Sequence, residues 1–420
     1  MTPFINAGNL NKRIRRTIFV IASLSILVVV IFSNRISLIH TSRRQLLALS
    51  LLQHNMFGTM PQISTANRFL NSSVAGERSA AIPLILLWTN WFGEPWPYEE
   101  GRVICGREEL KCDLTRDQTY YDMSKALVFH GADTGCSEPA FFPEDRRMDQ
   151  VWVYHNMENP IISSNMGVQL SDLFNGIFNW TMTYSRDADI VTPYGSVVKG
   201  KFENGYQPTR NYAEGKTHLI AWASSKCYEG RTQFVRNLSQ HIEVDMFGEC
   251  GNSYCPRDEE CWRYITKHYK FYLSFENKIC KDYVTEKFYN NALRRGLVPI
   301  VVGGANYRDH HVAPPGSYID ALQFDNIKEL AQYIAKVAAD DRLYNSFFRW
   351  RSNYSIIEYD QLDYFCALCK RLHKNTKPDR IRYDFSSFWN PDTSNCRPYP
   401  IADDSRIKPQ FKYFYPSDSN

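Results

Sequence analysis

Short runs of hydrophobic residues recur along most of the chain, and glycine, proline or polar residues bound each of them. The clearest runs lie at residues 82–88, 126–129, 151–154, 218–222 and 242–247. Runs of this length are typical of strands that are buried on both faces, as in the parallel sheets of α/β domains. The pattern therefore predicts an α/β protein.

The most regular pattern lies in the second half of the chain. Residues 271–275 form an apolar run that predicts a strand, and residues 297–302 predict another, which Gly303-Gly304 end. Between them apolar residues recur at helical spacing, with Asp282 or Thr285 as a candidate N-cap and Gly296 as the stop. Strand, helix and strand in this order form one half of a Rossmann-like sheet.

We expect the body of the chain to divide into two lobes. Residues 81–205 and 206–372 each carry one series of predicted strands, and a linker rich in Gly, Asn, Lys and Tyr lies near their junction at 199–216. Residues 373–420 are rich in Pro, Asp, Ser and aromatic residues and show little periodicity. We therefore expect a mostly irregular tail that packs on the body.

One apolar stretch near the N-terminus is longer than the others. Residues 17–32 carry no charge, follow several Lys and Arg residues and precede Arg35. Their length is at the low end for a membrane-spanning helix, and no small-residue cleavage site follows, which disfavours the alternative of a cleaved signal peptide. We predict a cytoplasmic tail at 1–16, a transmembrane anchor at 17–33 and a polar stem at 34–80, with the body on the luminal side.

Composition narrows the class of protein. The 49 basic and 45 acidic residues give a net charge of +4, which is too balanced for a nucleic-acid binder that works by charge alone. The 11 cysteines predict disulfide bonds in an oxidising compartment, with at least one thiol left over. Zinc is the alternative at Cys366-Ala-Leu-Cys369, although no second CxxC or ligand-spaced histidine pair accompanies it.

Potential N-glycosylation sites agree with a luminal body. Asn-x-Ser/Thr acceptors occur at Asn71, Asn179, Asn237 and Asn353. Glycans are added to such sites only in secretory compartments, so the four sequons agree with the predicted topology.

Candidate chemistry gathers where the predicted strands at 271–275 and 297–302 end. The polar residues at this edge are Glu276, Asn277, Tyr283, Thr285, Glu286 and Lys287. An acid for sugar hydroxyls, a lysine for phosphate and two glycines for close backbone approach suit a nucleotide-sugar pocket. Solvated residues on a first helical turn are the alternative. No GxGxxG or GxxxxGK[ST] motif supports a dinucleotide or P-loop site.

At these residues the chain resembles a known family. The run FYLSFENKICKDYVTEKFYNNALRRGLVPIVVGGANY, with FFRWR at 347–351, closely resembles the signature of the α1,3-fucosyltransferase family, glycosyltransferase family 10. The upstream blocks WVYHNMENP, FNWTMTYSRDADIVTPYG and AWASSKC follow the family's order, so the resemblance covers roughly residues 83–372. It implies a GT-B architecture, with two Rossmann-like lobes facing a cleft. It also implies a single-pass type II enzyme of the Golgi membrane.

The resemblance further implies the reaction. The family transfers fucose from GDP-fucose, with inversion, to the 3-hydroxyl of N-acetylglucosamine in a glycan acceptor. Inversion by single displacement needs one general base and no covalent nucleophile. Glu158 in MENP takes the place of this base, although Asn159 stands where the family usually has serine.

The donor-binding roles are implied in the same way. Arg231 and Lys287 would offset the charge of the diphosphate, and Glu286 would bind the donor sugar. Asn277 and Tyr283 would line the nucleotide pocket.

Two other motifs receive structural interpretations. Asp187-Ala-Asp189 has the form of a manganese site in other glycosyltransferases, but it lies in the first-lobe block, so we expect a structural or acceptor-side use. The resemblance also implies no metal ligands and no required cofactor, although manganese stimulates some family members. His130, His310 and His311 have no ligand-spaced partners and are interpreted as strand-end and loop residues.

The sequence leaves the acceptor open. The core N-acetylglucosamine of an N-glycan and an outer-arm lactosamine both suit the family, and the CKDYVTEK and CGNSYC blocks, more like those of invertebrate and plant members, favour the core. The alternatives to a fucosyltransferase are an inverting glycosyltransferase with another donor and an inactive glycan-binding relative.

Overall fold

The computed structural model describes residues 82–400, except for 108, 135–141, 166–173, 201–206, 208, 254–257, 360 and 375–380. The predicted cytoplasmic tail, anchor and stem lie outside the described residues, as do Asn71 and residues 401–420. Across the part that is described, none of the helices has both the length and the apolar character needed to cross a membrane.

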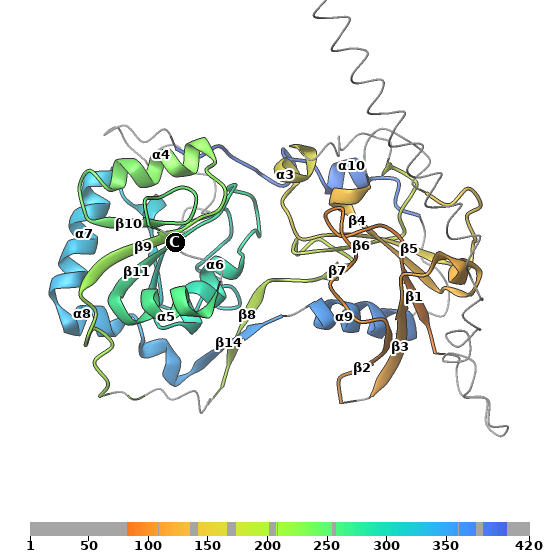
Figure 1. Ribbon diagram of the computed structural model, residues 1–420, viewed down its shortest axis with the longest axis horizontal. Coiled ribbons are helices and arrows are strands. Elements are labelled where there is room, and N and C mark those ends of the chain that lie inside the picture. The colour runs from red at the N-terminus through yellow and green to blue at the C-terminus, as the bar shows by residue number, and fades with distance from the viewer. Residues whose placement is uncertain are drawn as a thin grey trace, which may run out of the picture. The chain divides into compact units, whose positions relative to one another are not determined.

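The first half of the body is built on a seven-stranded sheet (Figure 1) with the order β2-β3-β1-β4-β5-β6-β7. All of its neighbouring strands are parallel except the β2–β3 hairpin. Its strands are β1 (Leu84–Leu87), β2 (Gly101–Cys105), β3 (Leu110–Thr115), β4 (Ala126–His130), β5 (Val151–Asn156), β6 (Trp180–Thr183) and β7 (Ile190–Val191). The runs predicted at 82–88, 126–129 and 151–154 thus become β1, β4 and β5.

Both faces of this sheet are covered, which explains why its central strands have continuous apolar runs. Alternate residues of a strand point to opposite faces. On one face Ile85 and Leu87 of β1 pack with Leu368 of helix α9 (Gln361–Lys374). On the other face Leu86 packs in an aromatic cluster that includes Phe385 of the short helix α10 (Phe385–Phe388).

The second half of the body holds a five-stranded, fully parallel sheet with the order β10-β9-β11-β12-β13. Its strands are β9 (His218–Ala223), β10 (Val244–Phe247), β11 (Tyr269–Phe275), β12 (Val298–Val302) and β13 (Ile319–Asp320). Helices α4 (Glu229–Leu238) and α7 (Ile327–Ala339) share a core with one face, and α5 (Glu259–His268) covers the other. The predicted strands at 218–222, 242–247, 271–275 and 297–302 are confirmed.

The helix predicted between β11 and β12 forms, but it is not a regular α-helix. It consists of α6 (Glu286–Phe288) followed by a π-helical turn, η5 (Tyr289–Arg294). Thr285 is the N-cap, because its side chain accepts a hydrogen bond from the backbone N–H of Lys287. Asp282 cannot be the cap, since its φ of 61° lies in the left-handed region, and Gly296 ends the helix with a φ of 72°.

A two-stranded antiparallel ladder joins β8 (Gly195–Lys199) to β14 (Tyr354–Glu358). Of the predicted linker at 199–216, the described residues beyond Lys199 hold no helix or strand. The remaining short elements are α3 (Pro160–Asn165), α8 (Asp341–Ser346), η1 (Gln118–Met123), η2 (Gly131–Asp133), η6 (Ala321–Gln323) and η7 (Arg349–Ser352).

Helix α9 departs from the expected division of the chain. We expect the second lobe to extend to residue 372, but Phe365, Leu368 and Leu372 lie in the core of the first sheet. Two disulfides, Cys105–Cys366 and Cys112–Cys369, join α9 to the β2–β3 hairpin. The apolar face of α9 and its two cysteines therefore return the chain to the first half of the body.

The prediction of disulfides is confirmed. Besides the two at α9, the structure contains Cys227–Cys250 and Cys280–Cys396. Both cysteines of the Cys366–Cys369 motif are oxidised, so they are not the zinc thiolates of the alternative interpretation.

Candidate active site

Two polar loops follow strands of the two sheets and contact each other. Glu158 lies two residues after β5 ends, and Asn277 lies two residues after β11 ends. Ligands of parallel α/β sheets bind beyond the carboxyl ends of their strands. The two loops therefore place the candidate base and the candidate nucleotide pocket at one location.

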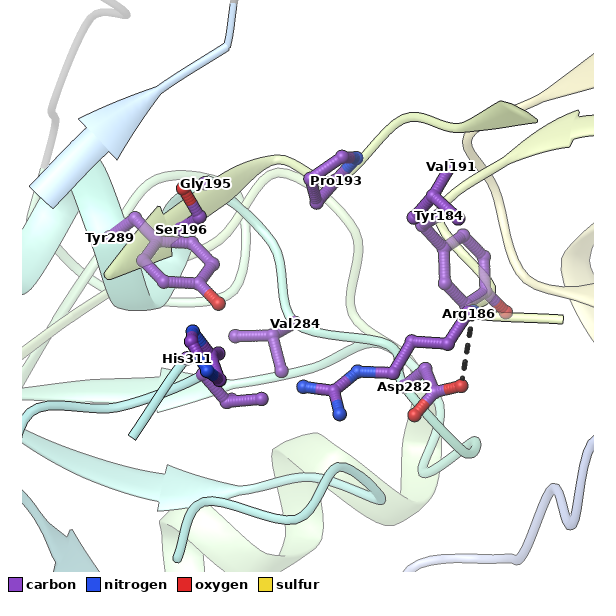
Figure 2. Close-up of a pocket in the computed structure, with 11 residues that line it drawn as sticks. Tyr184, Arg186, Val191, Pro193, Gly195, Ser196, Asp282, Val284, Tyr289 and His311 are labelled. Carbon is purple, nitrogen blue, oxygen red and sulfur yellow. Dashed lines mark hydrogen bonds between the residues drawn. The ribbon is translucent and has the colours of Figure 1, made fainter. Parts of the chain in front are cut away.

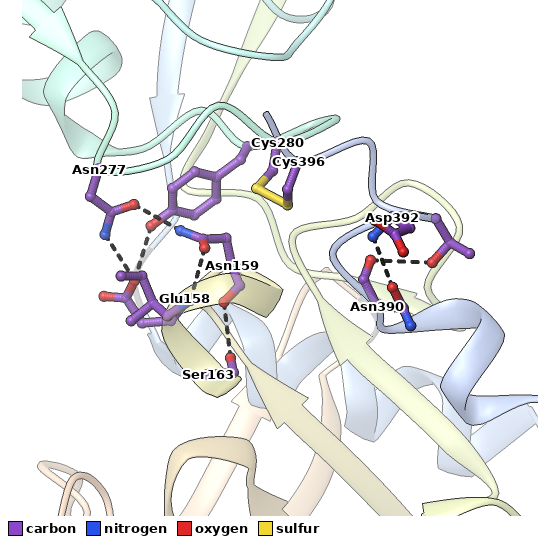
Figure 3. Close-up of a disulfide and its surroundings, with 11 residues drawn as sticks. Glu158, Asn159, Ser163, Asn277, Cys280, Asn390, Asp392 and Cys396 are labelled. Atoms are coloured by element: carbon purple, nitrogen blue, oxygen red, sulfur yellow. Dashed lines mark hydrogen bonds between the residues drawn. A yellow bond between two sulfur atoms is a disulfide. The ribbon is translucent and has the colours of Figure 1, made fainter. Parts of the chain in front are cut away.

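Glu158 is held by donors from the second half of the body (Figure 3). Asn277 Nδ2 and the Tyr283 hydroxyl both donate to Glu158 Oε2, each at 3.2 Å. The backbone N–H of Glu158 donates to Asn156 Oδ1 at 2.9 Å, which fixes the loop after β5. Among the described residues no donor reaches Oε1. One carboxylate oxygen is thus anchored, and the other is available to accept a proton.

Asn159 connects the same two loops. Its Nδ2 donates to Asn277 Oδ1 at 2.8 Å, and its Oδ1 accepts from the backbone N–H of Ile162 at 3.1 Å, where α3 begins. The residue is fully buried. The asparagine that departs from the family's usual serine therefore contributes directly to the geometry around Glu158.

The C-terminal segment braces the loop that carries Asn277 and Tyr283. Cys280, which lies between these two residues, is bonded to Cys396 (Figure 3). Ile279 pairs with Arg397, and the Tyr399 hydroxyl donates to the backbone carbonyl of Glu276. A segment distant in sequence thus fixes the donors to Glu158.

Arg231 lies on the first turn of α4 and is only 3% exposed. Its guanidinium donates to the Phe275 carbonyl at 3.3 Å, the Lys226 carbonyl at 2.7 Å and the Ser224 hydroxyl at 2.8 Å. Within the described parts of the chain it has no carboxylate partner, and its Nε–H makes no hydrogen bond. A buried cation without a counter-ion is costly, so this position favours an anionic ligand.

Lys287 lies on helix α6, between two acids. Its ammonium forms ion pairs with Glu276 and Glu286, both at 3.2 Å. Burial opposes the charge of Lys287, but the two carboxylates outweigh it and raise its pKa, so that the side chain stays protonated. Arg231 acts electrostatically on Lys287, which indicates that the two cations share one region.

The sequence singled out Glu276 as a polar residue of this edge without giving it a role. Glu276 is fully buried, and burial raises the pKa of its carboxyl group, although Lys287 acts in the opposite direction. Its carboxylate accepts from both the backbone N–H and the hydroxyl of Thr285. Thr285 of the TEK motif is the sequence signal that points to Glu276. Its backbone N–H and hydroxyl hold the Glu276 carboxylate beside Lys287.

The Asp187-Ala-Asp189 motif is engaged by basic side chains. Asp187 pairs with Lys281 at 2.8 Å, while Asp189 pairs with Arg382 at 3.3 Å and Arg371 at 3.8 Å. Asp189 also accepts from the backbone of Thr181 at 2.9 Å. Both carboxylates are thus paired with cations from separate segments of the chain. This arrangement agrees with the structural interpretation.

The histidines lie at a strand end and in a loop, as interpreted from the sequence. His310 and His311 are exposed loop residues, and His130 is the last residue of β4. His130 is fully buried and hydrogen-bonded to Asp133, and its ring lies 4.1 Å from that of Trp91.

The sequence did not reveal the aromatic cluster around this histidine. Its members are Trp91, Phe92, Trp96, His130 and His155. Burial lowers the pKa of His130, whereas Asp133 and Glu158 act to raise it, so Glu158 lies within electrostatic reach of the cluster.

A separate cavity of about 290 Å³ is lined in part by Asp282 and Val284, which belong to the loop that also carries Asn277 and Tyr283 (Figure 2). Its lining includes Tyr184, Arg186, Asp282 and His311, and the backbone N–H of Arg186 donates to the Asp282 carboxylate. Glu158, Asn277 and Lys287 are not part of its lining. The candidate base and donor residues therefore lie outside this cavity.

The three described sequons differ in accessibility. Asn353 is exposed and Asn237 is partly exposed, whereas Asn179 is only 7% exposed. Asn179 Oδ1 accepts from the Trp152 backbone at 2.8 Å and from Arg146 at 2.6 Å. The Asn179 side chain is thus part of the packed interior.

Comparisons with known proteins identify the family of the chain. Residues 80–195 match "Fucosyltransferase, N-terminal", and residues 213–388 match "Glycosyltransferase family 10 (fucosyltransferase) C-term". Crystal structures of an α1,3-fucosyltransferase, free or with GDP, share 14% identity at TM-scores of 0.40 and 0.38, which are too low to support an inference. The GDP-bound structure is covered over 95% of its length and covers 73% of this chain.

Sequence relatives are more informative. Glycoprotein 3-alpha-L-fucosyltransferase A of Drosophila melanogaster is 35% identical over 74% of this chain, which spans 61% of that relative's length. Alpha-(1,3)-fucosyltransferase C of the same species is 32% identical over 81% of this chain and 85% of its own length. Human 4-galactosyl-N-acetylglucosaminide 3-alpha-L-fucosyltransferase FUT6 is 32% identical over 74% of this chain and 84% of its own length. Two matching family domains in order, together with these relatives, establish that the chain belongs to the α1,3-fucosyltransferase family, glycosyltransferase family 10.

Proposed function

We propose that this protein transfers L-fucose from GDP-fucose to the 3-hydroxyl of an N-acetylglucosamine residue in a glycoprotein glycan, with inversion. The single observation that carries the proposal is the contact between the two loops. It sets the carboxylate of Glu158, whose Oε1 accepts from no donor among the described residues, in a region that also holds two cations, Arg231 and Lys287, since all three act electrostatically on Tyr228. The names of the relatives support fucose as the transferred sugar.

Glu158 acts as the general base in this proposal. Oε2 is anchored by Asn277 and Tyr283, so Oε1 faces the acceptor hydroxyl and takes its proton as the oxygen attacks the anomeric carbon of fucose. The attack and the departure of GDP occur on opposite faces of that carbon, which produces inversion without a covalent intermediate.

Arg231 and Lys287 stabilise the diphosphate that leaves. Negative charge increases on its oxygens as the bond to fucose breaks, and preorganised cations are most effective against such charge. Arg231 has no counter-ion of its own among the described residues, so the diphosphate supplies the missing anion. Glu286, which is partly exposed beside Lys287, is suited to the hydroxyl groups of the fucose.

The architecture follows from the same assignment. Two α/β halves with a site where their strand ends meet suit a GT-B enzyme, in which the first half binds the acceptor. In the aromatic cluster around His130, the rings of Trp91 and Phe92 are accessible, and they are suited to pack against an acceptor sugar. We also propose the type II anchor at residues 17–33 and a Golgi location, on the charge pattern of the N-terminus.

A nucleotide-release assay tests the reaction. With a mixed panel of N-glycan and lactosamine acceptors, GDP release is expected from GDP-fucose, and no release is expected from UDP-sugars. Release from a different donor would identify another glycosyltransferase, and binding of glycans without release would identify an inactive relative. Separate core N-glycan and lactosamine acceptors then determine the specificity, and we expect the core to be preferred.

A further inference from the structure

The ammonium group of Lys287 has no unused hydrogen. It donates to the Thr285 hydroxyl at 2.8 Å, to Glu276 Oε2 at 3.2 Å and to Glu286 Oε1 at 3.2 Å. An ammonium carries three N–H groups, so all three are occupied. A diphosphate oxygen can therefore bind Lys287 directly only if one of these partners leaves.

The two acids beside Lys287 are held very differently. Glu276 is 0% exposed, follows β11 directly and donates its backbone N–H to the Val302 carbonyl at 3.2 Å. Its Oε1 also accepts from the backbone N–H of Thr285 at 2.8 Å. The Glu286 side chain is 46% exposed on the first turn of α6. Glu276 is fixed by the fold, whereas Glu286 can turn toward solvent.

The energetics also favour release of Glu286, rather than Glu276, from Lys287. Removing one partner from a buried ion pair leaves a desolvated charge, which is strongly unfavourable, whereas a solvated carboxylate replaces lost contacts with water. Burial already opposes ionisation of Glu276, and Lys287 and Thr285 are the partners that compensate for it. Arg231 is the other cation that acts on Lys287, and its positive charge also attracts an anion to this region.

We propose that Glu276 is a positioning residue that holds Lys287 toward the diphosphate of the donor, and that Glu286 occupies the third N–H until the diphosphate displaces it. This inference rests on the proposed function, since it assigns the order of events at the same site. The carboxylate of Glu286, once displaced, is free for the hydroxyl groups of the donor sugar. Glu276 and Glu286 lie at the same distance from Lys287, yet they have opposite effects on the affinity for GDP.

Calorimetric titration of the purified protein with GDP, and with guanosine as a ligand that lacks phosphate, tests the inference. Glu276→Gln keeps the volume of the side chain but turns its amide toward Lys287, so GDP affinity is expected to fall about tenfold or more. Guanosine affinity is expected to stay within about twofold, because guanosine carries no group for Lys287. Glu286→Gln removes the competing carboxylate, so GDP affinity is expected to rise about threefold or more.

The Lys287→Ala background provides the matched control. If both acids act through the lysine, neither substitution changes GDP affinity further in that background. Unchanged GDP affinity in Glu276→Gln, or an equal loss in both variants, overturns the inference. If Glu276→Gln does not fold, as judged by thermal melting, the half-exposed Glu286→Gln decides alone, and unchanged or weaker GDP binding overturns the inference. Absence of GDP binding by folded wild-type protein overturns the proposed function itself.

Discussion

Replacing Glu158 with glutamine isolates the proton transfer from the geometry of the site. The amide oxygen of glutamine can take the place of Oε2 and keep the hydrogen bonds from Asn277 and Tyr283. The amide NH₂ then occupies the place of Oε1 and cannot accept a proton. We therefore expect the loops to stay in contact and GDP affinity to stay within about threefold, while the base is lost.

The expected loss of rate in Glu158→Gln is that of a missing general base alone. Loss of a positioned general base costs about 10²- to 10⁴-fold in rate, which corresponds to about 3–5 kcal/mol in activation free energy. Tyr283→Phe removes one of the two donors to Oε2 and leaves the carboxylate in place. A hydrogen bond to a charged group contributes about 1.5–3 kcal/mol. Because this bond holds the Glu158 carboxylate in position, Tyr283→Phe is expected to lower the rate of transfer by at least about tenfold. The rate is measured by GDP release under saturating donor, and GDP affinity by calorimetry.

Asp187→Asn serves as the matched control. It neutralises another carboxylate of the first half, 65% exposed and paired with Lys281, and is expected to leave the rate within about threefold. A rate for Glu158→Gln close to that of the wild-type enzyme would refute the assignment of the base. Equal losses of rate and of GDP affinity would show instead that the substitution disturbs the loop contact.

Three further outcomes are expected. Endoglycosidase treatment of membrane or secreted material is expected to remove glycans from Asn353 and Asn237 but not from Asn179, whose side chain is buried. Substitution of one sequon at a time, followed by gel mobility, identifies the glycosylated sites. A glycan on Asn179 would contradict the packing of its side chain. Activity in excess chelator is expected to persist, because Arg371 and Arg382 already pair with Asp189. A complete loss of activity that manganese reverses would instead indicate that Asp187 and Asp189 bind a metal ion. Burial lowers the pKa of His155 to about 3, so the unfolded chain binds its proton first as the pH falls below about 6.5. The free energy of unfolding is therefore expected to decrease by up to about 2 kcal/mol between pH 6.5 and 5 in denaturant titrations, and a His155→Gln variant with an undiminished slope would exclude this histidine as the cause.

The strands were predictable because burial on both faces leaves a direct mark on the sequence. β4, β5 and β11 each contain a buried apolar run for that reason. Thr285 and Gly296 mark the ends of the helix between β11 and β12 by their capping chemistry. The π-helical turn η5 was not predictable, since its apolar spacing is close to that of an α-helix.

The candidate site was only partly predictable for a different reason. The residue types of Glu158, Arg231 and Lys287 indicate their chemistry, but their partners come from other segments of the chain. Asn159 shows this clearly, because its contact with Asn277 joins residues 118 positions apart. The return of α9 to the first sheet likewise depends on cysteine pairing, which a single sequence does not determine.

The route of the chain through α9 has a consequence for biosynthesis. The first sheet is synthesised early, yet the helix that covers one of its faces is made only after the whole second sheet has emerged. Until then the β2–β3 hairpin exposes apolar surface together with Cys105 and Cys112, two thiols whose partners do not yet exist. The native pair Cys105–Cys366 spans 261 residues, so it forms only after most of the chain is made, and the first half completes its fold late rather than in order from the N-terminus. Once Cys105–Cys366 has formed, the two remaining cysteines are held close together, and Cys112–Cys369 closes only a short additional loop.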